Sequence, residues 1–83
     1  MSDRLVYPID FEAYERDELI EIVEFLALLE QYHDERGNVS AEKLKQAHGR
    51  FREIVNSIAE EKRIDKAFAK QTGISIYQTM KNL

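Results

Sequence analysis

The residues that could ligate a metal ion or catalyse a reaction are few, and the densest set of them is His33-Asp34-Glu35. Adjacent residues of a helix point about 100° apart, so these three side chains cannot converge on one ion unaided. The other histidine, His48, fits no zinc-binding motif with His33. We expect both to be structural histidines. The alternative is a small ligand- or metal-binding protein, or an enzyme, in which the fold brings His33 and His48 together.

Carboxylates form a second group with catalytic potential. Glu61 and Asp65 are one helical turn apart, and Glu60 lies beside them. General acid-base chemistry requires such proximity and also a pocket that shifts the pKa values. Because two lysines and an arginine surround these carboxylates, we expect a solvated, charged helix surface. The sequence therefore predicts no catalytic residue, no cofactor and no metal site, and a protein that is not an enzyme.

Nucleic-acid binding is a third alternative, since short helices joined by tight turns are typical of helix-turn-helix domains. Lys43, Lys45, Arg50 and Arg52 supply basic side chains, but at helical spacing they do not form one stripe. The whole chain carries a net charge of −4, whereas DNA-binding domains usually have a basic surface. We therefore expect no nucleic-acid partner.

Composition narrows the class of protein. The 83 residues fit one domain, and without cysteine the chain can form neither disulfides nor thiolate zinc sites. The longest uncharged apolar run, Phe25 to Leu29, is far shorter than the roughly 20 residues of a transmembrane helix. The first residues do not have the pattern of a secretory signal. We expect a cytoplasmic protein that has no membrane partner.

The charge is divided unevenly along the chain. Residues 1–40 contain 11 acidic and 3 basic side chains, whereas residues 41–83 contain 5 acidic and 9 basic side chains. One interpretation is that the two halves pack on each other and gain a weak attraction. The other is that an acidic face and a basic face serve docking or head-to-tail association.

Helical periodicity dominates the sequence after an N-terminal arm. Apolar residues alternate over 5–11 around Pro8, which predicts an extended arm over 1–14. Beyond it, apolar spacing and stop signals predict helices at about 15–35, 41–56, 58–72 and 75–82. Ser40, Ser57 and Ser75 are the predicted N-caps, and Glu60 completes a capping box with Ser57. The predicted fold is all-α: a compact bundle of three main helices plus a short C-terminal helix, with the extended arm packed across it.

The first helix has more apolar residues than one packed face can bury. One stripe belongs to the predicted core, which comprises Ile22, Val23, Leu26, Leu29, Leu44, Phe51, Ile54, Val55, Ile64 and Phe68. Outside the stripe formed by Leu19, Ile22, Val23, Leu26 and Leu29, the helix has four further large apolar residues: Ile20, Phe25, Leu28 and Tyr32. These four form the candidate interface, which would contact a second copy or an unknown protein partner.

Several short segments, in order, resemble a known family. They are Tyr7-Pro8-Ile9-Asp10-Phe11, Phe51-Arg52-Glu53-Ile54-Val55, Ala59-Glu60-Glu61-Lys62 and Ser75-Ile76-Tyr77. Over residues 7–82 the chain is similar to the YktA-like uncharacterised proteins of low-GC Gram-positive bacteria. Asn56, Ile58 and Tyr14 depart from that pattern, where proline, lysine and tryptophan are usual. The resemblance implies a small, helical, cytoplasmic protein and supplies no activity, cofactor or site residue. The predicted function is a non-enzymatic protein-interaction module, either homodimeric or bound to another protein.

Overall fold

Four helices account for most of the structure, a computed structural model that describes residues 12–34 and 39–83. They are α1 (Arg16–His33), α2 (Ala41–Val55), α3 (Ile58–Thr72) and α4 (Ile76–Lys81). Each helix lies within its predicted range, and the described residues contain no strand. The predicted all-α fold of three main helices and a short C-terminal one is confirmed. The arm over residues 1–11 and the helix stop predicted at Gly37-Asn38 lie outside the described residues.

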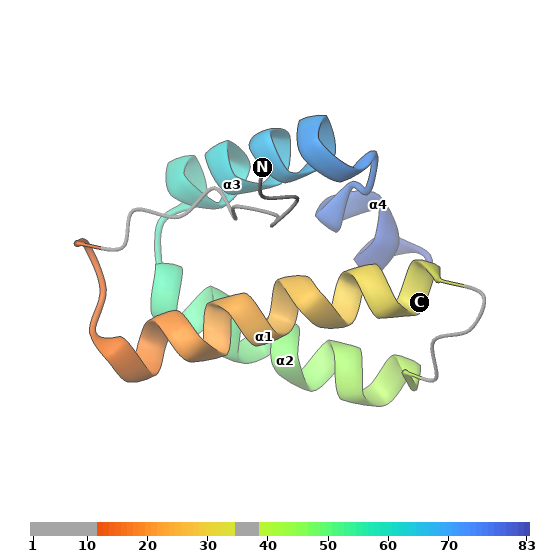
Figure 1. The fold of residues 1–83 in the computed structure, drawn as a ribbon, viewed down its shortest axis with the longest axis horizontal. Helices are drawn as coiled ribbons and strands as arrows, with labels where there is room; N and C mark the ends of the chain where they lie inside the picture. The colour runs from red at the N-terminus through yellow and green to blue at the C-terminus, as the bar shows by residue number, and fades with distance from the viewer. Residues whose placement is uncertain (1–11, 35–38) are drawn as a thin grey trace, which may run out of the picture.

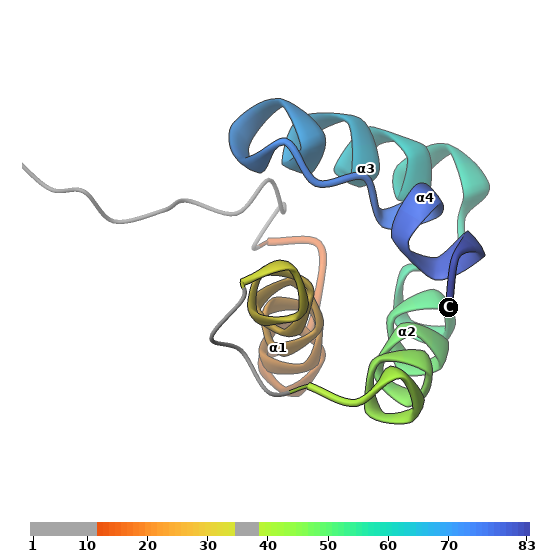
Figure 2. The ribbon, with the colours of Figure 1, turned by 90° about the vertical axis from the view of Figure 1, so that its right-hand side faces the viewer.

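The helices form two pairs of chain neighbours. Helices α1 and α2 lie side by side and antiparallel, and α3 and α4 lie on the other side of the core (Figures 1 and 2). Arg50 of α2 ties the first pair together, since its Nε and Nη2 donate to the two carboxylate oxygens of Glu21 at 2.8 and 2.9 Å. This hydrogen bonding lowers the pKa of the Glu21 carboxyl below its ordinary value. A short connection links the end of α2 at Val55 to the start of the second pair at Ile58.

Three of the helices begin at a serine N-cap. Ser40, Ser57 and Ser75 accept hydrogen bonds from the backbone N–H three residues on, as predicted for N-caps. The reciprocal half of the predicted capping box does not form, because the Glu60 carboxylate instead accepts from Arg63. Between α2 and α3, Asn56 has φ 47°, a left-handed conformation in which asparagine is tolerated. The chain thus turns from α2 into α3 within two residues.

The core lies between the two helix pairs. Phe25, Phe51 and Phe68 are its largest fully buried residues. Eight predicted core residues are buried, and Val23 and Ile54 are partly buried against them. The core also contains Phe25 and Ile76, which were not predicted to belong to it. Tyr14, from the end of the predicted arm, packs against this core. None of the described helices is both long enough and apolar enough to cross a membrane.

Candidate functional site

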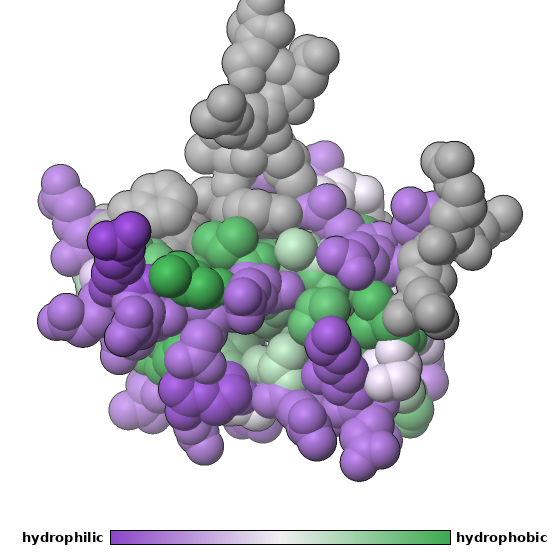
Figure 3. Space-filling view, turned by 60° about the horizontal axis from the view of Figure 1, so that its bottom comes forward, coloured by the Kyte–Doolittle hydropathy of each residue, from purple (hydrophilic) through white to green (hydrophobic). Residues whose placement is uncertain are grey.

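The four residues of the predicted interface differ in burial and do not form one exposed surface. Phe25 is 0 % exposed, so its assignment to an interface is wrong: its ring lies 4.9 Å from that of Phe51, centroid to centroid. Leu28 is partly buried against the core, whereas Ile20 and Tyr32 are exposed. Figure 3, which views the α1 and α2 side, shows hydrophobic side chains in separate groups between hydrophilic ones. The described part of α1 therefore has no single apolar face made of these four residues.

The two histidines have separate surroundings. The Nε2 of His33 is 2.8 Å from Thr79 Oγ1, a hydrogen bond that joins the end of α1 to the buried face of α4. The His48 ring instead lies against Phe25, with ring centroids 5.4 Å apart. No group of three or more histidine or carboxylate side chains gathers as a metal site within residues 12–34 and 39–83. Each histidine thus has a structural contact of its own.

His48 is half-buried, and its surroundings change its acidity. Burial lowers the pKa of the His48 imidazole below its ordinary value, and the positive charge of Arg52 lowers this pKa further. The negative charge of Glu61 acts in the opposite direction and is the weakest of the three influences. The folded protein therefore favours the neutral imidazole.

The lowered pKa of His48 predicts a pH-dependent stability. Between that pKa and the unfolded value of about 6.5, the unfolded chain binds more protons than the folded chain. The free energy of unfolding should therefore fall as the pH drops through this window. Urea denaturation between about pH 7.5 and pH 5.5 measures the slope, and a His48→Gln variant should have a smaller one. An equal slope in the variant would assign the effect to other groups.

The carboxylates at Glu60, Glu61 and Asp65 each have a different partner. Glu60 binds Arg63, and this hydrogen bonding lowers the pKa of the Glu60 carboxyl. Glu61 Oε2 lies 3.7 Å from Arg52 Nε, an ion pair that connects α3 to α2. Asp65 Oδ1 accepts the backbone N–H of Ile76 at 2.8 Å, at the first residue of α4. Glu61 and Asp65 thus connect α3 to its neighbouring helices, whereas Glu60 is paired within α3.

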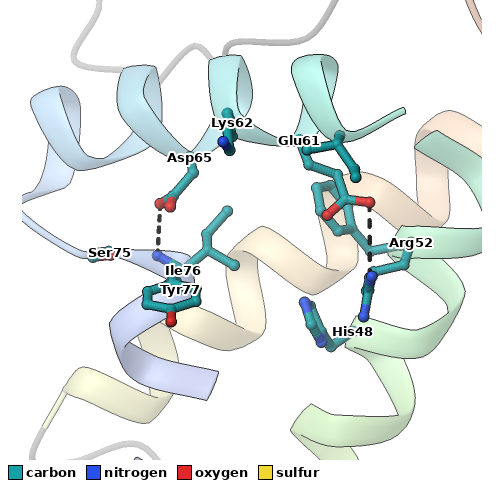
Figure 4. A pocket seen from close by; sticks show the side chains of 10 residues that line it. His48, Arg52, Glu61, Lys62, Asp65, Ser75, Ile76 and Tyr77 are labelled. Atoms are coloured by element: carbon teal, nitrogen blue, oxygen red, sulfur yellow. Dashed lines mark hydrogen bonds and ion pairs between the residues drawn. The ribbon is translucent and has the colours of Figure 1, made fainter. Parts of the chain in front are cut away.

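A groove opens where α2, α3 and α4 meet, and we call it the α2–α3–α4 groove. Its volume is about 650 Å³, and Phe51 and Ile76 are its buried apolar residues. In Figure 4 the Arg52–Glu61 ion pair lies at one end of the view, and the Asp65–Ile76 contact lies at the other. The other lining residues are His48, Ile58, Lys62, Ser75 and Tyr77.

Two strongly exposed apolar residues line this groove. Ile58 is 69 % exposed and Tyr77 is 64 % exposed, which makes them more exposed than Ile20 at 49 %. Neither was predicted as a site residue. Ile58 is the first residue of α3, where helical periodicity gives little information about burial. Tyr77 is the second residue of α4, and its side chain points about 100° from that of the buried Ile76.

The charges around the groove are unequally neutralised. Its carboxylates at Glu61 and Asp65 already have partners within the chain. Lys62 and Lys81 have no carboxylate partner in the part of the chain that the structure describes. The Nζ of Lys81 lies 5.9 Å from the centroid of the Tyr77 ring, a cation–π distance. The groove thus combines exposed apolar groups with one unneutralised cation in its lining, Lys62, and a second, Lys81, beside its lining residue Tyr77.

Fold and site together define a small helical protein in which an open groove lies between three of the four helices described for residues 12–34 and 39–83. Residues 4–83 match the Uncharacterised protein family (UPF0223), and the chain belongs to this family. The resemblance inferred from the sequence, to an uncharacterised family of low-GC Gram-positive bacteria, is confirmed.

The similarity extends over most of this chain and most of each relative. A UPF0223 protein of Bacillus cytotoxicus is 40 % identical over 74 residues, which cover 89 % of this chain and 80 % of the relative. A UPF0223 protein of Streptococcus uberis is 35 % identical over 80 residues, covering 96 % of this chain and 84 % of the relative. No solved structure matches the chain. The names of these relatives assign no activity.

Proposed function

We propose that this protein is a non-enzymatic protein-interaction module of the bacterial cytoplasm, and that the α2–α3–α4 groove is its binding surface. The observation that carries the proposal is the exposure of Ile58 and Tyr77 beside a groove with buried apolar residues. Exposed apolar groups that gather around a hollow are typical of protein-binding surfaces. Binding would remove both side chains from water.

Support for a non-enzymatic role comes from the titratable side chains of the groove. Glu61 is held by Arg52, and Asp65 is held by the backbone of α4, so both carboxylates stabilise the fold. Support for a protein partner rather than nucleic acid comes from Arg50. Its guanidinium forms ion pairs with Glu21 and Glu53. These engagements reduce the number of basic side chains that are available to phosphates.

Site-specific photo-crosslinking tests the proposed surface. A photoreactive phenylalanine analogue replaces Tyr77, and the protein is irradiated in a Bacillus or Streptococcus lysate, from the genera of its relatives. We expect a discrete covalent adduct with another protein molecule, and mass spectrometry then shows whether it is a second copy of this chain or a different protein. An Ile58→Ser substitution in the same chain should weaken the adduct, because it removes the other exposed apolar side chain of the groove.

The matched control places the same analogue at Tyr32, an exposed tyrosine that does not line the groove. An adduct of equal yield at both positions would indicate non-specific capture and would count against the groove. Absence of any adduct at position 77, with the protein folded by circular dichroism, would contradict the proposed function.

A further inference from the structure

We propose that the α2–α3–α4 groove binds the outward face of α1 from a second copy of this chain, which produces head-to-tail association. This inference rests on the proposed function, because it uses the same groove and names its occupant. The face of α1 in question consists of Asp17, Ile20 and Glu24, and we call it the acidic face of α1. All three residues are exposed.

The acidic face of α1 has a chemistry that matches the groove. Ile20 is 49 % exposed, and it has a carboxylate one turn before it at Asp17 and another one turn after it at Glu24. Neither carboxylate has an ion-pair partner in the described ranges 12–34 and 39–83. An apolar side chain between two unneutralised carboxylates therefore projects from the helix.

The groove presents the complementary pattern on two helices. On α3, Lys62 follows the exposed Ile58 by one turn, and on α4, Lys81 follows the exposed Tyr77 by one turn. Each exposed apolar residue of the groove thus has an unneutralised lysine beside it. Docking of Ile20 against Ile58 and Tyr77 would bring the two carboxylates of α1 towards the two lysines. Complementary charge at such a contact selects the partner and its orientation.

The arrangement of the helices determines how copies would be joined. No residue of α1 lines the groove, and Figure 2 shows α1 and α4 on different sides of α2. One molecule can therefore offer its acidic face to one neighbour while its groove receives another. A contact between two different surfaces is heterologous, so repeated contacts give rings or open chains. The unequal charge of the two halves of the sequence is the basis of this contact.

Sedimentation velocity of the purified full chain at increasing protein concentration tests the inference. We expect the average mass to rise with concentration and to fall when salt is added. The salt effect arises because the Debye length shortens from about 10 Å at 0.1 M to about 3 Å at 1 M. A chain that stays monomeric at every concentration in low salt would overturn self-docking. The proposed function would still stand if position 77 forms an adduct with a different protein.

Charge inversion makes the test specific to these two surfaces. The groove variant carries Lys62→Glu with Lys81→Glu, and the face variant carries Asp17→Lys with Glu24→Lys. Each variant alone should associate more weakly than the original chain, by a factor of roughly ten or more. The reason is that its two docking surfaces carry charge of the same sign. An equimolar mixture should associate again, since the inverted groove of one variant complements the inverted face of the other.

A matched control variant, Lys66→Glu with Lys70→Glu, has the same change of net charge on exposed positions of α3 that do not line the groove. It should associate like the original chain. Circular dichroism confirms that every variant is folded. Association that persists in the groove variant or the face variant, or a mixture that remains monomeric, would overturn the inference.

Discussion

Replacing Phe25 with alanine is expected to lower the free energy of unfolding by about 3–5 kcal/mol. The side chain is 0 % exposed and lies against the rings of Phe51 and His48, at centroid distances of 4.9 and 5.4 Å. Its removal eliminates apolar burial and leaves a cavity that the rigid helix pairs can only partly fill. For a domain of this size, such a loss is a large share of the total stability.

Urea denaturation of the variant measures this loss, and Ile20 provides the comparison. Ile20→Ala also shortens an apolar side chain of α1, but Ile20 is 49 % exposed and should cost no more than about 0.5 kcal/mol. The two variants together separate a core position from a surface position on the same helix. Similar losses in both variants would show that Phe25 is not a core residue.

Replacing Asp65 with alanine is expected to cost about 1.5–3 kcal/mol, the range for a hydrogen bond to a charged group. The Asp65 carboxylate accepts the Ile76 N–H at 2.8 Å, and the variant leaves this donor at the start of α4 without its partner. Because α4 has six residues, it depends on such contacts to remain docked. Hydrogen exchange should therefore accelerate in α4 more than in α1.

The control for this prediction is Asp65→Asn, which keeps a side-chain oxygen as acceptor and removes the charge. It should retain part of the stability that the alanine variant loses. Equal losses in both variants would assign the effect of Asp65 to its charge rather than to the hydrogen bond. Unchanged exchange in α4 would mean that the Asp65 contact does not hold this helix.

The helices could be predicted because their signals are local. Ser40, Ser57 and Ser75 each cap the helix that follows them, and apolar spacing within each helix marks the side that faces the core. The role of Phe25 could not be predicted in the same way. Helix α1 carries two apolar stripes, and only the packing of α2 against it, where Phe51 and His48 contact Phe25, decides that Phe25 is also covered.

The groove could not be predicted because it depends on contacts between residues that are far apart in the sequence. Its lining residues come from three helices, and the left-handed turn at Asn56 sets the angle at which α3 leaves α2. The docking of Ile76 into the core turns its neighbour Tyr77 outwards. The charge asymmetry, in contrast, was already visible in the sequence. The structure locates two of its unneutralised lysines beside exposed apolar side chains.

The pairing of helices that are neighbours in the chain also affects the rate of folding. Helix α1 packs chiefly on α2, and α4 packs chiefly on α3, so most contacts join residues that are close along the chain. Little loop-closure entropy is lost when such contacts form, and proteins dominated by local contacts fold in microseconds to milliseconds. The α2–α3–α4 groove forms only when the second helix pair docks on the first. Each newly made chain would therefore expose an incomplete groove for only a short time.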